Sequence, residues 1–164
     1  MPIVSNTSPI LNLAIINQLD LLHQQFGEVI IPPTVLLELK PETNYPGANF
    51  IQSALAAQWL RVVELTNPHL AQALMLELDQ GEAAAIALAL ELEHKQVLMD
   101  EREGRAKAKA LGLQPVGILG VLLRAKFAGQ ITSVETVMRS LQGEAGFFIA
   151  DELFEAVLVE AGER

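Results

Sequence analysis

Residues 3–10 read Ile3-Val4-Ser5-Asn6-Thr7-Ser8-Pro9-Ile10, and this stretch sets the fold class from the start of the chain. Two β-branched residues followed by four small polar residues are typical of a short buried strand that turns directly into a helix. Pro9 suits the first turn of that helix, where its missing N–H breaks no hydrogen bond. Apolar residues then recur at helical spacing from Leu11 to Leu22, which predicts one helix to about Gln25.

The same alternation of strand and helix continues along the chain. Further strands are predicted at 28–31, 60–65, 96–99 and 114–116, and further helices at 34–39, 49–58, 68–78, 82–94, 104–111, 119–128, 134–141 and 151–161. Every residue from Ala83 to Leu90 is apolar, as expected for a helix buried on all sides. The pattern predicts an α/β fold, with a central parallel sheet covered by helices on both faces in a three-layer α/β/α sandwich.

Length and composition indicate one folded domain. The chain has 164 residues, of which 51% are hydrophobic and 19% charged. We expect residues 1–141 to form the domain and residues 142–164 to form a C-terminal helical appendage of the same unit. The longest apolar run is too short to cross a bilayer, the N-terminus resembles no secretory signal, and there is no cysteine for disulfides or thiolate metal sites. These features predict a cytoplasmic protein with no membrane partner.

The net charge of −9 argues against a nucleic-acid partner, because binding to phosphates requires Lys and Arg. The distribution of the basic residues argues the other way. Residues 102–126 contain only one acidic residue, Glu103. They contain six of the eleven basic residues: Arg102, Arg105, Lys107, Lys109, Arg124 and Lys126. We expect the first four of these residues to guide RNA, although a solvated helix face explains the cluster equally well when it is taken alone.

Polar residues that carry chemistry are expected at the carboxyl ends of the strands, where parallel sheets form their sites. Residues 5–8 and the pair Asp100-Glu101 follow two predicted strands, while Glu38 and Glu82 interrupt apolar surroundings. Each has an ordinary explanation: Glu82 suits a helix dipole, Glu38 faces water, Asp100 caps the next helix and Asn6 suits a turn.

Taken together, the carboxylates predict a metal site, because acidic groups that share a cleft repel one another unless a cation neutralises them. Mg²⁺ and Mn²⁺ prefer oxygen ligands, and such an ion activates water and stabilises charge on a phosphate. The three histidines are scattered without ligand spacing. No glycine-rich phosphate loop and no GxSxG motif is present.

The run from Val4 to Ile10 resembles the opening motif of PIN domains, in which an Asp usually stands at the position of Asn6. The later pieces follow in the family's order. Glu38 ends a PxxVxxEL-like stretch, Gly81-Glu82-Ala83 opens the central helix, and residues 100–103 close a strand. Residues 110–113 and 117–126 resemble a bacterial and archaeal subgroup, the DUF3368 family.

The resemblance implies a three-layer sandwich and an endoribonuclease that depends on Mg²⁺ or Mn²⁺, often the toxin of a toxin–antitoxin pair. It implies the catalytic residues Glu38, Glu82 and Asp100 and the metal ligands Asn6, Glu38, Glu82 and Asp100. Glu101 would be an auxiliary acid at the metal, and Thr7 or Ser8 would orient the site. Glu101 or Glu103 also suits the role of Asp100.

The partners that the resemblance implies are RNA, a small antitoxin protein and a second copy of the chain in a homodimer. Asn6 leaves a second interpretation open, because a neutral amide replaces the usual carboxylate at the first position. In that interpretation the chain is a catalytically weakened PIN-like module that binds RNA or a protein partner without turnover.

Overall fold

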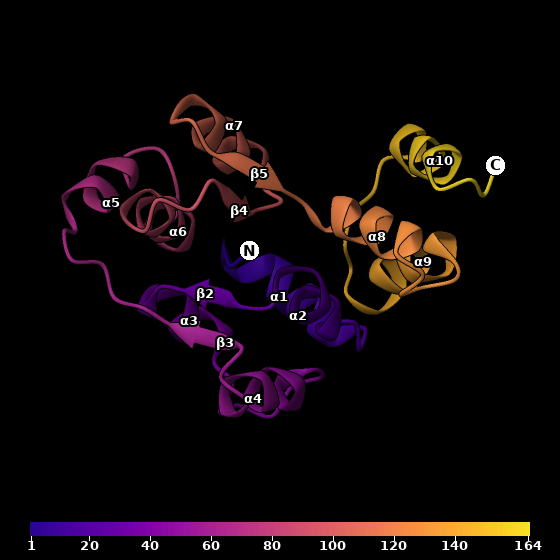
Figure 1. Ribbon diagram of the computed structural model, residues 1–164, viewed down its shortest axis with the longest axis horizontal. Helices are drawn as coiled ribbons and strands as arrows, with labels where there is room; N and C mark the ends of the chain where they lie inside the picture. Colours follow the sequence, from indigo (N-terminus) through magenta and orange to yellow (C-terminus); the bar gives the residue numbers. More distant parts are fainter.

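A computed structural model describes all 164 residues and contains a five-stranded parallel sheet flanked by helices (Figure 1). The strands lie in the order β3-β2-β1-β4-β5. They are β1 (Ile3–Ser5), β2 (Val29–Ile31), β3 (Leu60–Val62), β4 (Gln96–Leu98) and β5 (Gln114–Val116). The chain builds outward from β1 on one side and then returns to add β4 on the other. The carboxyl ends of β1 and β4 therefore mark the point where ligands bind to open parallel sheets.

Alternate strand residues face opposite layers of helices. Ile3 and Val29 belong to the larger apolar cluster, whereas Val4 and Val97 belong to the smaller one. Seven helices contribute to the larger cluster: α1 (Thr7–Ile15), α2 (Asp20–Phe26), α3 (Pro33–Leu39), α4 (Ala48–Ala56), α8 (Ile118–Phe127), α9 (Val134–Glu144) and α10 (Asp151–Glu160). Helices α5 (His69–Leu74), α6 (Gln80–Glu91) and α7 (Arg102–Ala110) contribute to the smaller one. The three-layer sandwich predicted from the sequence is confirmed.

Helix α6 is the buried helix that the unbroken apolar run predicts. It contacts β1 and β4 on one side and α3, α5 and α7 around the rest of its surface, so nine of its twelve residues are buried. Its many alanines let these neighbours approach closely. Neither this helix nor any other in the structure has the length and apolar character needed to cross a membrane.

The prediction of one helix to about Gln25 is wrong, because the segment forms two helices, α1 and α2. Asn17 has a left-handed backbone conformation (φ 58°), and the Gln18 N–H donates to the Leu13 carbonyl oxygen at 2.8 Å. Ile16 and Leu19, in the turn, are nevertheless buried in the larger cluster. The apolar spacing continues through the turn because turn and helices cover the same core, and it therefore conceals the break.

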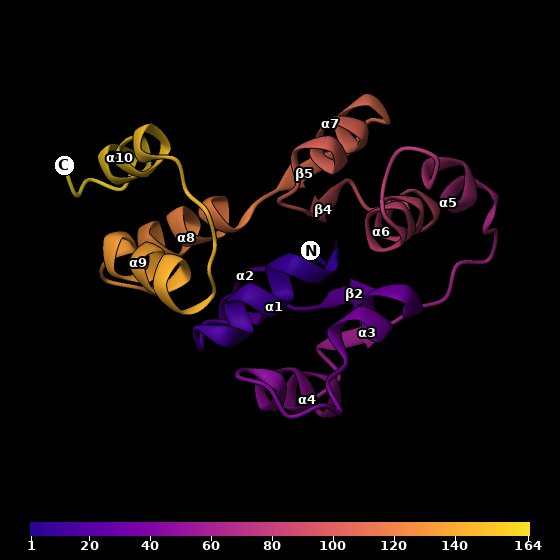
Figure 2. The ribbon, with the colours of Figure 1, turned by 180° about the vertical axis from the view of Figure 1, so that it is seen from behind.

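The C-terminal residues pack against α8 and α9 and lie away from the sheet (Figures 1 and 2). Helix α9 continues to Glu144, past the expected boundary at residue 142, and Phe154, Val157 and Leu158 of α10 join the larger cluster. Near the chain end, Glu163 accepts hydrogen bonds from the backbone of α9 and from Lys126 of α8. The division into a domain and an appendage stays a prediction.

Candidate functional site

A cleft of about 530 Å³ opens at the carboxyl end of β1 and β4, between α3 and the first turns of α6 and α7. We call it the acidic cleft. It is lined by Asn6, Thr7, Ser8, Leu11, Glu38, Lys40, Asp79, Glu82, Glu101 and Glu103. Leu11 is its only large apolar residue and Lys40 its only basic one. The structure therefore brings together six of the predicted site residues: Asn6, Thr7, Ser8, Glu38, Glu82 and Glu101.

Asn6 and Glu82 are, with Ser5, the only polar or charged residues buried in the molecule, at 4% and 5% exposure. Asn6 occupies the N-cap position of α1, yet its side chain makes no capping hydrogen bond. Its side chain therefore does not serve the local turn, which was its ordinary explanation. Because burial of polar groups costs free energy, their placement in one cleft points to a functional role.

Gly81, in the first turn of α6, leaves the space in which the oxygens of two site residues converge. A β-carbon at this position would overlap Glu38 Oε1 and would lie 3.0 Å from Asn6 Oδ1. Thr7 Oγ1 donates a hydrogen bond to the same Glu38 oxygen and so holds the carboxylate over the cleft. The lack of a side chain at Gly81 thus keeps oxygens from β1 and α3 facing one small volume.

Glu82 has one carboxylate oxygen committed to the helix and one free. Its Oε1 accepts from the Asp79 N–H at 3.2 Å, and its own N–H donates to Asp79 Oδ1 at 2.8 Å, which forms a capping box. Its Oε2 lies 3.0 Å from the β-carbon position of Gly104 on α7. Burial raises the pKa of Glu82, and so do the negative charges of Asp79 and Glu101. The hydrogen bond from the Asp79 N–H has the opposite effect but does not outweigh them. A cation in the cleft would relieve this uncompensated negative charge.

The structure separates Asp100 from the other predicted ligands. Asp100 Oδ1 accepts from the Ile118 N–H at 2.9 Å, so the side chain caps α8 rather than the helix that follows it in sequence. Its Oδ2 is buried without a hydrogen-bond partner. Burial raises the pKa of Asp100 to about 6, although the Ile118 N–H and the Arg105 charge favour the ionised form. Glu101 and Glu103, the alternatives to Asp100, line the acidic cleft instead.

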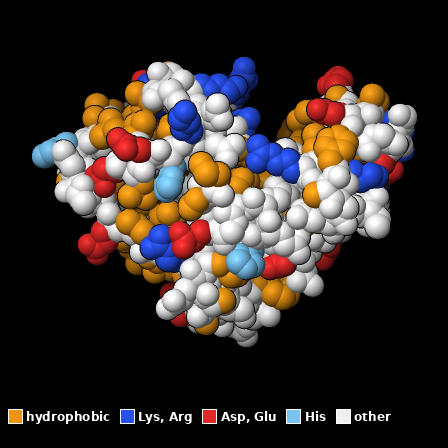
Figure 3. Space-filling view, viewed as in Figure 1, with side chains coloured by type: hydrophobic (Ala, Val, Ile, Leu, Met, Phe, Trp, Pro, Cys, Tyr) orange, Lys and Arg blue, Asp and Glu red, His pale blue; other side chains and the backbone are white.

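Asp100 lines a second cavity of about 500 Å³ between β5, α7, α8 and the segment before α10. We call it the hollow. Its other lining residues are Arg105, Pro115, Val116, Gly117, Leu119, Gly120, Arg124, Phe147, Phe148 and Leu153. The space-filling view shows a notch between the α7–β5 region and the α10 arm, bordered by basic and apolar side chains (Figure 3).

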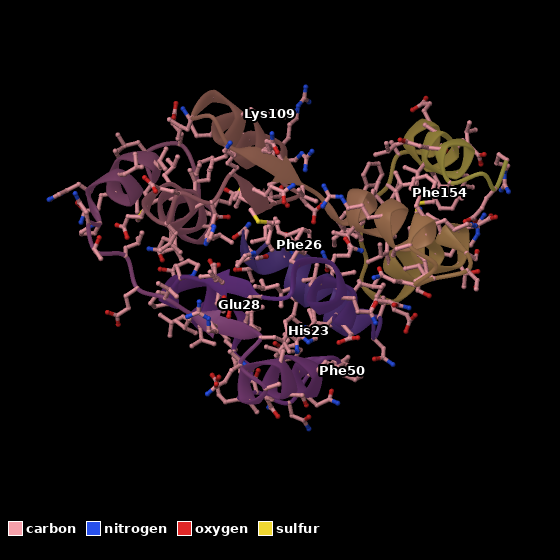
Figure 4. The ribbon with its side chains drawn as sticks, viewed as in Figure 1. His23, Phe26, Glu28, Phe50, Lys109 and Phe154 are labelled. Carbon is pink, nitrogen blue, oxygen red and sulfur yellow. The ribbon has the colours of Figure 1, made fainter.

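The four predicted RNA-binding residues on α7 have different surroundings. Arg105 lines the hollow and donates to the Met99 carbonyl oxygen at 2.9 Å. Lys107 forms an ion pair with Glu77 at 2.5 Å. Arg102 and Lys109 are exposed, and Figure 4 marks Lys109 on the outer side of the helix.

Sequence reasoning did not assign several of the residues that line these two cavities, among them Lys40, Asp79, Arg124 and Phe148. Asp79 had a readable signal, because an Asp three residues before Glu82 forms the pattern of a capping box. Arg124 belongs to the basic cluster of residues 102–126, whereas Lys40 and Phe148 had no signal, since only the folded chain brings them to a cavity. No group of three or more acidic or histidine side chains is close enough to hold a metal by itself. A bound ion would therefore need the Asn6 amide or water among its ligands.

The fold and cleft define a three-layer α/β domain with carboxylates gathered at the switch point of a parallel sheet. The sequence matches the family model DUF3368, described as a PIN domain, over residues 2–163, and the chain belongs to this family. PIN domains are in general nucleases, so the chain has a nuclease fold. Comparisons with curated proteins and with solved structures gave no match.

Proposed function

We propose that the protein is an endoribonuclease of PIN type that uses Mg²⁺ or Mn²⁺ in the acidic cleft. The observation that carries this proposal is the convergence of Asn6 Oδ1 and Glu38 Oε1 in a cleft that buried Glu82 also lines. Three elements supply these oxygens, and all three meet at the carboxyl end of the sheet. Asn6 and Glu82 are buried and Glu38 is exposed, and the burial of Glu82 without a basic partner is costly unless a cation binds there.

The residues present fit a hard divalent ion. Mg²⁺ is usually held by one or two carboxylates together with waters and substrate phosphates, and Glu38, Glu82 and the Asn6 amide match that set. Ser8 also lines the cleft, and its Oγ is buried without a hydrogen-bond partner in the absence of a ligand. Glu101 or Asp100 would complete the site from the end of β4. A bound ion of this kind lowers the pKa of a water and neutralises charge that develops on a phosphate.

The side chains of the cleft have separate tasks in the proposed reaction. Thr7 fixes the Glu38 carboxylate, and the capping box fixes Glu82, so that the free Glu82 Oε2 is available to accept a proton from the attacking water. Lys40 ends α3 in the left-handed conformation and forms no ion pair with the surrounding carboxylates. Its ammonium group is therefore available for a phosphate oxygen of the substrate.

The positions of the basic residues that form no ion pair support RNA as the substrate in spite of the negative net charge. Five of the eleven basic residues form ion pairs with carboxylates: Arg61, Lys107, Lys126, Arg139 and Arg164. The six others form no ion pair: Lys40, Lys95, Arg102, Arg105, Lys109 and Arg124. All of them except Lys95 lie on α7 or line the acidic cleft or the hollow. Unpaired cations near a cleft raise the local concentration of a polyanion.

We further propose that the protein acts as the toxin of a toxin–antitoxin pair, with a small antitoxin protein and a second copy of the chain as partners. The family resemblance supports this role. The neutral Asn6 favours the second candidate function, a PIN-like module that binds RNA or a protein partner without turnover. With Asn6, the set of Asn6, Glu38 and Glu82 has one carboxylate fewer than a set that begins with Asp.

The test is RNA cleavage by the purified protein with Mn²⁺, Mg²⁺ or EDTA, alongside thermal unfolding in the same buffers. Metal should be required for cleavage and should stabilise the fold by about 2.7 kcal/mol at a hundred times its dissociation constant. Glu82→Gln should lower cleavage by about 10²- to 10³-fold and remove the stabilisation. Glu152→Gln, a matched change at an exposed residue of α10, should alter neither.

The result also separates the two candidate functions. Stabilisation by metal without cleavage would support the binding module, and Asn6→Asp should then tighten Mn²⁺ binding by restoring a carboxylate. If the protein shows no cleavage, and no stabilisation by metal that depends on Glu82, the proposed site is ruled out.

A further inference from the structure

The hollow has a lining that differs from that of the acidic cleft and that the proposed reaction does not use. Its volume of about 500 Å³ lies in the range of small-ligand pockets. Apolar side chains of β5, α8 and the segment before α10 alternate with Arg105 and Arg124. A cavity with apolar walls and two cations suits a ligand that has both a flat apolar part and a negative charge.

Phe148 stands on the rim of the hollow with 85% of its surface exposed. The residues on both sides of it are anchored. The Phe147 N–H donates to the Leu141 carbonyl oxygen at 2.9 Å, and Ile149 is buried in the larger cluster. The ring of Phe148 is therefore exposed on a segment that its two neighbours hold in place. A ring so exposed adds little to the core and is available for a flat partner.

Neither arginine of the hollow forms an ion pair with a carboxylate, although the Arg105 charge acts on nearby Asp100, and both are held in place by other contacts. The Arg124 guanidinium lies over the Phe26 ring at 5.7 Å, and Arg105 donates to the Met99 carbonyl oxygen. Gly117 keeps the floor open, since a β-carbon there would lie 2.9 Å from Asp100 Oδ1 and 3.0 Å from Arg105 Nη1. The guanidinium groups therefore keep unused donors for phosphate oxygens.

The hollow and the acidic cleft meet at the end of β4. Asp100 lines the hollow and the next residue, Glu101, lines the acidic cleft. Both cavities open at the carboxyl end of the sheet. A flexible strand with one phosphate in the acidic cleft would therefore place an adjoining nucleotide at the hollow.

We propose that the hollow binds a nucleotide of single-stranded RNA next to the phosphate that the acidic cleft holds. The base stacks on Phe148, and Arg105 and Arg124 bind the flanking phosphates. This inference rests on the proposed function, because it takes RNA as the substrate. Stacking on an aromatic ring accepts any base, so this contact gives affinity for unpaired RNA rather than sequence specificity.

The test measures binding of the full chain to a labelled single-stranded RNA of about 12 nucleotides in EDTA, by fluorescence anisotropy. Phe148→Ala should weaken binding by about five- to a hundredfold, and Phe148→Tyr should restore it, because both aromatic rings stack. Phe127→Ala is the matched control, since Phe127 is 69% exposed on α8 and does not line the hollow. It should leave the affinity unchanged.

A second RNA, with abasic sites in place of its bases, tests the contact itself. If Phe148 stacks on a base, wild type and Phe148→Ala should bind abasic RNA equally. A loss that persists on abasic RNA, an equal loss in Phe127→Ala, or an unchanged affinity in Phe148→Ala would overturn the proposal. Unchanged RNA affinity with an altered sedimentation coefficient would assign the surface to a second copy of the chain.

Cleavage with Mn²⁺ separates this inference from the function on which it rests. If the wild type cleaves RNA and Phe148→Ala binds RNA as tightly as the wild type, the nucleotide site is overturned and the ribonuclease assignment stands. A wild-type chain that neither binds nor cuts RNA would overturn both.

Discussion

The acidic cleft and the hollow lie side by side at the same end of the sheet and have nearly the same volume, about 530 and 500 Å³. Their linings are opposite in character. Five carboxylates and one lysine line the cleft, whereas two arginines, one carboxylate and several apolar side chains line the hollow. The boundary between them passes between two consecutive residues, Asp100 and Glu101.

If the protein binds RNA as we propose, the two linings would take different parts in binding the polyanion. Carboxylates alone would repel RNA, so the cleft needs a cation before a phosphate approaches. In our proposal the hollow has no such need, because its two arginines and its exposed ring would attract phosphate and base directly. The comparison therefore predicts that metal acts through the cleft, that RNA affinity without metal depends on the hollow, and that each is changed by its own mutations.

The largest expected effect tests the boundary itself. Glu101→Gln should lower the affinity for metal and the rate of cleavage by about 10- to 100-fold, the range for residues that support a metal site. Glu101 lines the cleft, and its charge raises the pKa of Glu82. Asp100→Asn should weaken metal binding less, because Asp100 is engaged with the Ile118 N–H in the hollow. Thermal unfolding against Mn²⁺ concentration measures both variants.

If Asp100→Asn weakened metal binding more than Glu101→Gln, the Asp100 side chain would have to turn into the cleft when metal binds. The boundary would then move by one residue, and the set of ligands expected from the family resemblance would hold. Glu103→Gln is the third variant, since Glu103 also lines the cleft and, like Glu101, is exposed, but lies within the first turn of α7.

Most of the fold could be predicted from the sequence, because the signals that specify it are local. Two β-branched residues before Ser5 and the apolar run from Ala83 to Leu90 give the first strand and the buried helix without tertiary information. The turn at Asn17 could not be predicted. Its neighbours Ile16 and Leu19 are buried like helix residues, so apolar spacing alone does not reveal the left-handed backbone.

The candidate site was predictable only as a set of residue types, two groups of them at strand ends and two glutamates within apolar surroundings. Asn6 and Glu38 converge at Gly81, and Glu82 lines the same cleft, as the family resemblance suggested. The sequence could not decide which side chain after β4 faces the cleft. Asp100 and Glu101 differ in direction because one accepts a hydrogen bond from α8, a contact made across 18 residues.

The second prediction concerns the clasp at the chain end, which we define as Glu163 with Lys126, Val134 and Glu135. Burial would raise the pKa of Glu163, but hydrogen bonds from Lys126 Nζ (2.9 Å) and from the N–H groups of Val134 (2.6 Å) and Glu135 (3.0 Å) lower it to about 2. Glu163→Gln should lower the free energy of unfolding by about 2 kcal/mol, since hydrogen bonds to a charged group are lost or weakened. Urea unfolding measures the loss.

The clasp sharpens the comparison because α10 supports one wall of the hollow and none of the acidic cleft. Glu163→Gln should weaken RNA binding in EDTA and leave metal-dependent stabilisation unchanged. Its contribution to stability is present above pH 4.5 and disappears as the pH falls toward 2, because the pKa is lowered in the folded chain. Glu160→Gln, at an exposed position of the same helix, is the control. Equal losses of metal and RNA binding would mean that the two cavities are coupled.

The smallest expected effect uses Asp100 as a probe of the hollow in the absence of metal. Its pKa is raised from 3.8 to about 6 by burial, so its contribution to folding is fully present below pH 3.8 and is lost as the pH rises through about 6. Asparagine keeps the oxygen that accepts from Ile118 and removes the charge. Asp100→Asn should therefore be more stable than wild type by about 1–2 kcal/mol at pH 8 in EDTA, and by much less at pH 4.

The measurement is urea unfolding of both chains from pH 4 to pH 8, with Asp151→Asn as an exposed control. A difference that grows with pH through about 6 assigns the cost to the ionised Asp100 carboxylate. A difference that is constant with pH would instead reflect packing, because a change in protonation is the only contribution that varies with pH. If Asp100→Asn is less stable at pH 8, the attraction of Arg105 exceeds the cost of burial. The hollow would then resemble the clasp, where a carboxylate is held by its partners, and its contrast with the acidic cleft would be greater still.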